Sequence, residues 1–177
     1  VGAIVGGLFT EAELTAPKAF NHCAGKEDFY RQAAASQKLM LERLDNGREK
    51  EWLGPAARHE TALAEEALLK PGPVLITAPL KGEKRAAEKV ESDYGGDWGK
   101  LRDGVRCSIA VDSFEELPGA IKAFRENTGC KFAGPVKNRL QHRLDTGYGD
   151  ILCNVDFGNG FVGEVQFHLK RMLHAKQ

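Results

Sequence analysis

The chain has 177 residues, of which 42% are hydrophobic and 28% are charged. This length can bury one good core and is too short for two ordinary domains. Lysine plus arginine balance aspartate plus glutamate at 25 each, which excludes the overall basic field that duplex-binding proteins usually carry.

The N-terminal segment differs in character from the rest of the chain. Residues 1–9 are apolar, but they are about half as long as a membrane span and lack the basic start of a signal peptide. The sequence also begins at Val1 instead of a methionine. We therefore expect residues 1–25 to be a remnant or linker of a longer protein, residues 26–177 to form the domain, and no membrane segment in this fragment.

Three helices are predicted in the first half of the domain. Apolar residues at helical spacing predict a helix over 29–44, and the Asp-Asn-Gly sequence that follows ends it. A proline of the type found at the first helical position predicts a second helix from Pro55 to about Leu69. Residues 74–76 form a short extended run, and residues 81–93 are predicted to be the third helix.

Alternating residues predict a strand over 105–111, with Arg106, Ser108 and Ala110 on its outward side. Ser113 and Glu116 then form a capping box for a helix that ends near Asn127. Residues 131–137 are predicted to be a strand, and the Gly-Pro pair within it favours the edge of a sheet.

The end of the chain predicts a β-hairpin and a final helix. Residues 150–157 and 161–169 pair around a glycine-rich turn, and a helix starts at Lys170. In the second strand Phe161, Val165, Phe167 and Leu169 share the core side, whereas Val162, Glu164, Gln166 and His168 share the other. The elements together predict an α/β (α+β) fold with a mixed, mainly antiparallel sheet of about five strands flanked by helices.

The four cysteines Cys23, Cys107, Cys130 and Cys153 lack a Cys-x-x-Cys pair and a histidine at metal-ligand spacing. This pattern argues against a zinc site. We expect free thiols, with Cys107 and Cys153 buried on apolar strand faces.

Residues suited to nucleotide chemistry gather after residue 80. Lys81, Arg85 and Lys89 recur every four residues on the third helix, and such a basic face can hold a polyphosphate. Asp103 and Glu164 are separated carboxylates, which suit Mg²⁺ when substrate phosphates complete its ligands. The chain has no Gly-x-x-x-x-Gly-Lys-Ser/Thr motif, so phosphate transfer would proceed without a P-loop.

An aromatic ring precedes the hairpin at Tyr148, and a tyrosine ring can stack on either purine. Because stacking needs only the ring, Tyr148→Phe is expected to be nearly silent.

Together these motifs resemble the nucleotidyltransferase domain of RelA/SpoT-type alarmone synthetases. The resemblance covers roughly residues 80–176 and rests on Gly147-Tyr148, the following strand and turn, and Glu164-Val165-Gln166 with its Leu-Lys-x-Met tail. The forms Leu80-Lys81-Gly82-Glu83 and Asp103-Gly104-Val105-Arg106 are most similar to the branch found in bacterial polymorphic or secreted toxins. The resemblance implies a nucleotidyltransferase-like fold.

The resemblance also implies a role for each matching residue. Glu164 is the implied essential acid, which binds Mg²⁺ and helps to deprotonate the attacking 3′-hydroxyl, and Asp103 is the implied second metal ligand. Tyr148 is implied to stack on the acceptor base. The other implied substrate-binding residues are Lys81 and Lys89 for the ATP phosphates, Arg106 for the adenine or phosphates of ATP, Lys137 and Arg139 for the acceptor phosphates, and Arg85, Gln166 and His168.

The chain departs from the family pattern in several positions. Pro79 and Arg85 stand where the family's Arg-x-Lys-x-x-x-Ser series has its arginine and serine, and Leu152 replaces a common histidine. His168 stands in place of the usual arginine. Asp103 lies three residues before Arg106 instead of five; if it is not the second metal ligand, Asp150 is the next candidate.

The resemblance implies a Mg²⁺-dependent pyrophosphokinase that transfers pyrophosphate from ATP to the 3′-hydroxyl of an acceptor purine nucleotide, which gives (p)ppGpp or (p)ppApp. The toxin branch implies delivery into the cytoplasm of a target bacterium and a cognate immunity protein. One alternative is the same transfer to the 3′ end of tRNA, guided by the basic stretch 131–143. Another is a non-catalytic nucleotide-binding module.

Overall fold

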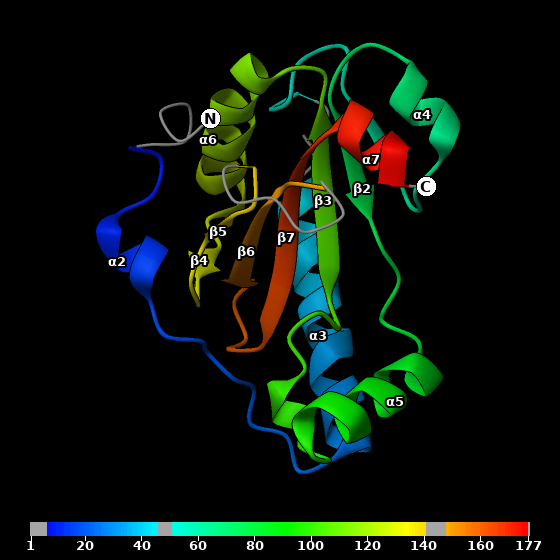
Figure 1. Cartoon of the computed structure of the whole chain (residues 1–177), viewed down its shortest axis with the longest axis vertical. Coiled ribbons are helices and arrows are strands. Elements are labelled where there is room, and N and C mark those ends of the chain that lie inside the picture. Colours follow the sequence, from blue (N-terminus) through cyan, green and yellow to red (C-terminus); the bar gives the residue numbers. More distant parts are fainter. Residues whose placement is uncertain (1–6, 46–50, 141–147, 177) are drawn as a thin grey trace.

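The structure, a computed structural model, describes residues 7–45, 51–140 and 148–176 (Figure 1). Within these ranges a seven-stranded sheet has the order β1-β2-β3-β7-β6-β4, and β5 also pairs with β6. The strands are β1 (Arg58–Glu60), β2 (Val74–Thr77), β3 (Arg106–Val111), β4 (Lys131–Phe132), β5 (Lys137–Asn138), β6 (Ile151–Asp156) and β7 (Val162–Leu169). Only β1–β2 and β3–β7 are parallel pairs in the described sheet. The predicted mixed, mainly antiparallel sheet is confirmed, although it has seven strands instead of about five.

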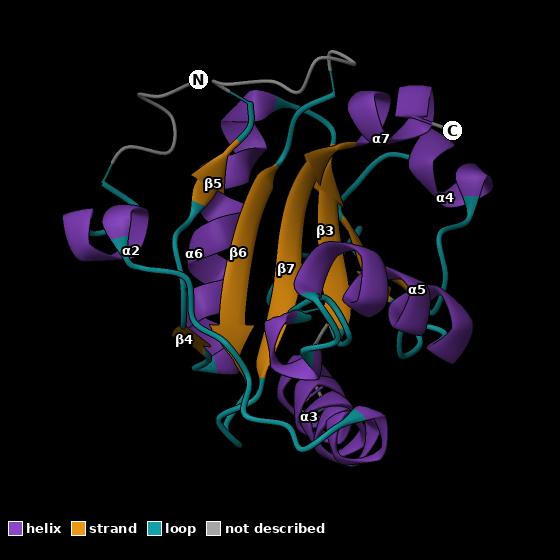
Figure 2. Ribbon diagram, turned by 60° about the horizontal axis from the view of Figure 1, so that its bottom comes forward, coloured by secondary structure: helices purple, strands orange, loops and turns teal. Residues whose placement is uncertain are grey.

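Helices cover both faces of this sheet (Figure 2). They are α2 (Glu11–Thr15), α3 (Lys26–Asp45), α4 (Glu65–Leu69), α5 (Glu83–Tyr94), α6 (Leu117–Thr128) and α7 (Lys170–Lys176). The main core lies between one face and helices α3 and α6, with Phe29, Phe124 and Phe167 fully buried. On the opposite face α4 and α7 form a smaller core over one end of the sheet, and α5 lies toward the other end. The polar face of β7 therefore opens between α4 and α7 at one end and α5 at the other.

The C-terminal hairpin forms as predicted. Strands β6 and β7 pair with Asn154 opposite Glu164, and Gly158 and Gly160 have φ values of 132° and 79° in the turn. Val165, Phe167 and Leu169 are completely buried on the core side, as their alternation predicts.

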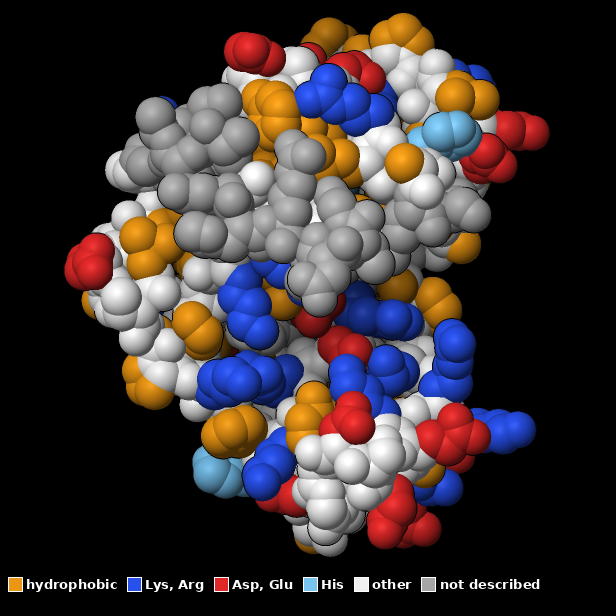
Figure 3. All heavy atoms as spheres, in the orientation of Figure 1, with side chains coloured by type: hydrophobic (Ala, Val, Ile, Leu, Met, Phe, Trp, Pro, Cys, Tyr) orange, Lys and Arg blue, Asp and Glu red, His pale blue; other side chains and the backbone are white. Residues whose placement is uncertain are grey.

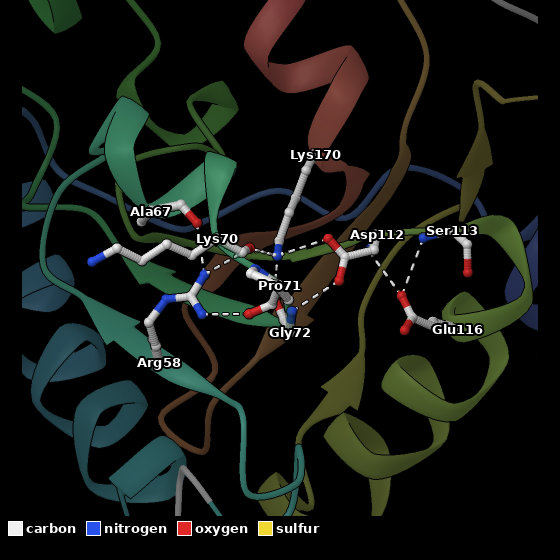
Figure 4. Close-up of polar contacts among 9 residues, drawn as sticks. All are labelled: Arg58, Ala67, Lys70, Pro71, Gly72, Asp112, Ser113, Glu116 and Lys170. Atoms are coloured by element: carbon white, nitrogen blue, oxygen red, sulfur yellow. Dashed lines mark hydrogen bonds and ion pairs between the residues drawn. The ribbon is translucent and has the colours of Figure 1, made fainter.

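The predicted helix from Pro55 to Leu69 is wrong over its first part. Arg58–Glu60 instead forms β1 beside β2, and only Glu65–Leu69 is helical. The Arg58 side chain donates hydrogen bonds to the carbonyls of Ala67, Lys70 and Pro71 at the end of α4 (Figure 4). Strand pairing and these long-range hydrogen bonds override the local helical preference.

Two strand predictions also need correction. Residues 131–137 contribute to two short strands, β4 and β5, instead of one, because Pro135 between them has no N–H group to donate to a neighbouring strand. Ala110 does not point to solvent but is fully buried in the smaller core beneath α4 and α7.

A buried lysine fixes the junction between β7 and α7 (Figure 4). Lys170 is 4% exposed, and its Nζ donates to the Lys70 carbonyl at 2.7 Å, to the Gly72 carbonyl and to Asp112 Oδ1 at 2.9 Å.

The predicted capping box before α6 is confirmed, because the Glu116 side chain accepts a hydrogen bond from the backbone nitrogen of Ser113. These contacts have a structural role.

The described part of the N-terminal segment packs against the domain. The Phe9 and Phe132 ring centroids are 5.6 Å apart, and Arg125 forms an ion pair with Glu13 at 2.9 Å. The assignment of residues 1–25 to a preceding part of a longer protein stays a prediction.

All four thiols are free, and Cys107 and Cys153 are buried as predicted. No helix in the described ranges combines the length and the apolar character that a membrane crossing requires.

Candidate functional site

A polar cavity of about 230 Å³ opens on the exposed face of the central strands, next to α5. Its lining residues are Lys89, Tyr94, Arg102, Asp103, Lys137, Arg139, Leu152, Asn154 and Glu164. Figure 3 shows basic side chains around acidic ones in the hollow at the middle of this face. The arrangement is that of an anion-binding site with two carboxylates inside it.

Asp103 lies in the loop before β3, where two lysines hold it. Lys81 Nζ and Lys89 Nζ approach its Oδ2 at 3.1 and 3.3 Å. Burial raises the pKa of Asp103, but the two ammonium groups outweigh this effect and hold the pKa below its usual range. Its Oδ1 is buried and has no hydrogen-bond partner, so this oxygen can accept a ligand.

Glu164 is placed by the pairing of β7 with both of its neighbours. It lies opposite Arg106 of β3 and Asn154 of β6 in the sheet register. The residue before it must be small, because a Cβ at Gly163 would lie 2.9 Å from the Val105 carbonyl oxygen. Glycine therefore allows β7 to approach β3 at the point where the acid enters the cavity.

The environment of Glu164 disfavours its charged form. Burial and the negative charge of Asp103 raise its pKa to about 7, against the opposing effect of Arg139 and Arg106. Within the described ranges no backbone or side-chain group donates a hydrogen bond to its carboxylate. A carboxyl group with a pKa near neutrality is suited to accept a proton from a substrate.

The two carboxylates fit a magnesium ion better than a zinc ion. Among the described residues no group of three or more His, Cys, Asp and Glu side chains is arranged to hold a metal. Mg²⁺ needs only one or two carboxylates when substrate phosphates and water supply its other ligands. The unpartnered Oδ1 of Asp103 and the carboxylate of Glu164 in the same cavity are oxygen ligands of the kind that such an ion takes.

Asp150 is committed to a buried ion pair. It is 0% exposed, and its two oxygens accept hydrogen bonds from Arg139 Nε at 2.5 Å and from the Arg139 terminal nitrogen at 2.8 Å. Gln166 Nε2 donates to the same carboxylate at 2.6 Å. Asp150 thus orients Arg139, and it is a poor candidate for the alternative metal ligand.

A second cavity of about 280 Å³ lies further along the same strand face. It is lined by Arg106, Ser108, Gln166 and His168 and by apolar residues, which are Ala62, Leu63, Ile76, Ala78, Pro79, Cys107 and Leu173. Such a mixture of apolar surface and a few polar groups is typical of a pocket for a small organic group.

His168 lies between this second cavity and Tyr148. It is only 2% exposed; its Nε2 lies 3.2 Å from Ser108 Oγ, and its Nδ1 is hydrogen-bonded to the Tyr148 hydroxyl. Burial and the nearby Asp150 raise the pKa of Tyr148, so its hydroxyl stays protonated. The hydroxyl therefore holds His168 in place. The expectation that Tyr148→Phe is nearly silent considered only stacking by the ring and did not include this hydrogen bond.

The structure brings most of the predicted site residues together. The polar cavity collects Lys89, Asp103, Lys137, Arg139 and Glu164, with Lys81 bound to Asp103, and the second cavity collects Arg106, Gln166 and His168. Arg85 is exposed on α5 and lines neither cavity. Gly147 and residues 141–143 of the predicted basic stretch lie outside the described residues.

Sequence reasoning missed three cavity residues, Tyr94, Arg102 and Asn154. The predicted hairpin could have identified Asn154, because this residue lies directly opposite Glu164 in the paired strands. Arg102 is next to Asp103 in the sequence, but no periodic pattern marks it.

Comparison with curated proteins finds a relative of this chain. The chain is 31% identical over 124 residues to the (p)ppApp synthetase toxin Tas1 of Pseudomonas aeruginosa (strain UCBPP-PA14). This match covers 70% of the chain but only 27% of the relative, so the chain spans about a quarter of the length of that protein. Models of protein families give no match.

Two solved structures share the fold. One is the complex between the type VI effector Tas1 and its immunity protein, with a TM-score of 0.56, 24% identity, and coverage of 86% of this chain and 66% of that one. The other is a GTP pyrophosphokinase family protein from Streptococcus pneumoniae, with a TM-score of 0.53, 12% identity, and coverage of 83% and 68%. The predicted resemblance to the RelA/SpoT-type synthetase domain and its toxin branch is confirmed.

Proposed function

We propose that this synthetase domain is a nucleotide pyrophosphokinase, which transfers pyrophosphate from ATP to the 3′-hydroxyl of a purine nucleotide. The observation that carries the proposal is the pair of carboxylates Asp103 and Glu164 in a cavity otherwise rich in lysine and arginine. Such a cavity neutralises phosphate groups and still offers a base for a hydroxyl proton. Because the relative Tas1 is a (p)ppApp synthetase, we favour an adenosine nucleotide as the acceptor.

Glu164 is the proposed general base. Its carboxylate lies in the cavity among the basic side chains that would hold the substrate phosphates, so it is placed to take the proton of the 3′-hydroxyl. The hydroxyl oxygen then attacks the β-phosphorus of ATP, the bond from the β-phosphorus to the α,β-bridging oxygen breaks, and AMP leaves with that oxygen. Lys81 and Lys89 hold the ATP phosphates beside Asp103.

The residues present fit a magnesium ion, with Asp103 and Glu164 as its protein ligands. When bound, the ion neutralises charge on the transferred phosphates. Arg106 lines the second cavity and lies opposite Glu164 in the sheet register, so we place the adenine of ATP in the second cavity, beside the apolar surface that includes Pro79.

On the acceptor side, Tyr148 stacks on the base, and Lys137 and Arg139 contact the phosphates. Gln166 and His168 act as positioning residues, because Gln166 binds Asp150 and His168 binds the Tyr148 hydroxyl. Arg85 is exposed and has at most a role in attracting ATP.

We further propose that the domain acts as a toxin in the cytoplasm of a target bacterium and that a cognate immunity protein binds it. A relative is a toxin, and a solved structure with the same fold is a complex of an effector with its immunity protein.

The test is to incubate the protein with ATP and Mg²⁺ and, in separate reactions, adenosine nucleotides, guanosine nucleotides or tRNA, and to identify products by mass. A purine nucleotide carrying a 3′-diphosphate supports the proposal. Modification of tRNA alone, with strong salt dependence, would support the RNA alternative. Nucleotide binding without AMP formation would indicate the non-catalytic alternative.

A further inference from the structure

We propose that the N-terminal segment contributes to the substrate site, and that Lys18 and Arg102 complete with Lys137 a subsite for the 5′-di- or triphosphate chain of the acceptor nucleotide. This inference rests on the proposed function, since it assigns one of the two nucleotides of that reaction. The basic cluster of Lys18, Arg102 and Lys137 is separate from Lys81 and Lys89, the two lysines that hold Asp103.

Asn21 anchors the segment beside the cavity. Its side chain is 5% exposed, donates to the Leu101 carbonyl at 3.1 Å and accepts a hydrogen bond from the Val162 backbone at 2.7 Å. Its own backbone nitrogen donates to the Gly99 carbonyl at 2.7 Å. The segment is thus tied to the loop that carries Arg102 and to the first residue of β7, the strand of Glu164.

The segment then passes beside Gly134 and Asn154. A Cβ at Gly134 would lie 3.8 Å from the backbone nitrogen of Ala19 and 3.4 Å from Asn154, which lines the cavity. Lys18, the residue before Ala19, is therefore held near the rim of the cavity, where its exposed side chain can reach a bound anion.

Arg102 lines the cavity and has hydrogen-bond donors without a partner. Its guanidinium carbon lies 5.7 Å from the centroid of the Phe20 ring, and its Nε and Nη1 are buried without a hydrogen-bond partner. A guanidinium that contacts an aromatic ring keeps its N–H groups available at its edge. Buried donors without partners are rare in folded proteins, so they indicate an acceptor that binds there.

The cations of the cluster have no ion-pair partner of their own among the described residues. Burial, together with the positive charges of Lys18, Arg102 and Arg139, lowers the pKa of Lys137 against the opposing effect of Glu164. Within the described part of the chain no carboxylate forms an ion pair with Lys18, Arg102 or Lys137. Cations that gather without a partner favour a multiply charged anion.

Lys137 and the N-terminal segment lie on the other side of β7 from Lys89, one of the two lysines that hold Asp103. Figures 1 and 2 place α5, with Lys89, on one side of β7 and β5, with Lys137, on the opposite side together with the N-terminal segment. Two phosphate-binding groups on opposite sides of Glu164 match a reaction in which donor and acceptor both carry phosphates.

The kinetic test uses Lys18→Ala and Arg102→Ala, with Lys122→Ala as the control, because Lys122 is exposed on α6 away from the cavity. The ratio of kcat/KM for an acceptor triphosphate to that for its monophosphate is measured for each variant. The loss of one phosphate contact is expected to lower this ratio about tenfold in both test variants and not in the control. An unchanged ratio in both test variants would overturn the subsite, and so would a loss confined to tRNA as acceptor.

A binding test separates this inference from the proposed function. Inorganic triphosphate is titrated into the wild-type protein and each variant by calorimetry, a measurement that needs no turnover. Weaker binding to Lys18→Ala and Arg102→Ala than to Lys122→Ala supports the subsite even if the wild type forms no product. Equal affinity in all variants overturns it even if the enzyme is active.

Discussion

Glu164→Gln is predicted to make the protein more stable at alkaline pH while it abolishes most of the activity. Burial and Asp103 raise the pKa of Glu164 from its ordinary value of 4.5 to about 7. Below pH 4.5 the group is protonated in both the folded and the unfolded chain, so it has no effect on the free energy of unfolding. As the pH rises from 4.5 to 7, the unfolded chain loses the proton first and stability falls.

The magnitude follows from the same shift. A pKa that rises from 4.5 to about 7 lowers the free energy of unfolding of the wild type by about 3 kcal/mol once the pH exceeds 7. Glutamine keeps the shape of the side chain and stays neutral, so it avoids this loss. We therefore expect Glu164→Gln to exceed the wild type by about 3 kcal/mol at pH 8 and by less than about 1 kcal/mol at pH 5.

Urea unfolding at the two pH values, without Mg²⁺ or nucleotide, measures this difference. Glu126→Gln is the matched control, since Glu126 is exposed on α6, and its effect should not depend on pH in the same way. Turnover of Glu164→Gln should fall at least about a hundredfold. A variant that is less stable than the wild type at pH 8, or equally altered at both pH values, would refute the argument.

Four other substitutions, at three residues, test the rest of the site. Asp103→Asn removes the carboxylate that Lys81 and Lys89 share, so turnover should fall and the Mg²⁺ concentration for half-maximal rate should rise; an unchanged Mg²⁺ titration would contradict its role as ligand. Tyr148→Ala should raise the acceptor KM more than the ATP KM, because stacking contributes about 1 to 3 kcal/mol. Tyr148→Phe should lower stability by about 1 to 3 kcal/mol, because His168 loses a buried partner; an unchanged urea midpoint would contradict this. Asp150→Asn leaves Arg139 without its buried partner and should cost about 3 to 5 kcal/mol in urea unfolding; a smaller effect than that of Tyr148→Phe would count against the ion pair.

Local patterns in the sequence were enough to predict the hairpin and most helices. The alternation from Phe161 to Leu169 separates the core side from the site side, since a strand has a period of two residues. The capping box at Ser113 and the glycines at 158 and 160 have equally local causes. These features do not depend on which other strands join the sheet.

Features that depend on distant partners escaped prediction. The three-residue strand β1 is paired only because β2 lies beside it, and the donors of Arg58 find carbonyls that lie nine or more residues further along the chain. The contribution of Arg102 to the cavity and the commitment of Asp150 to Arg139 likewise arise from tertiary contacts. His168 shares the face of Glu164, as the alternation predicts, but its burial depends on Ser108 and Tyr148.

The transfer of an intact pyrophosphate group is the central claim, and ATP labelled at the β-phosphorus tests it most directly. Wild-type protein with Mg²⁺ and a purine nucleotide acceptor should release unlabelled AMP and form an equal amount of labelled product, and Glu164→Gln should form almost none. Release of labelled ADP, or a labelled product without matching AMP, would show transfer of a single phosphoryl group or hydrolysis and would contradict the assignment.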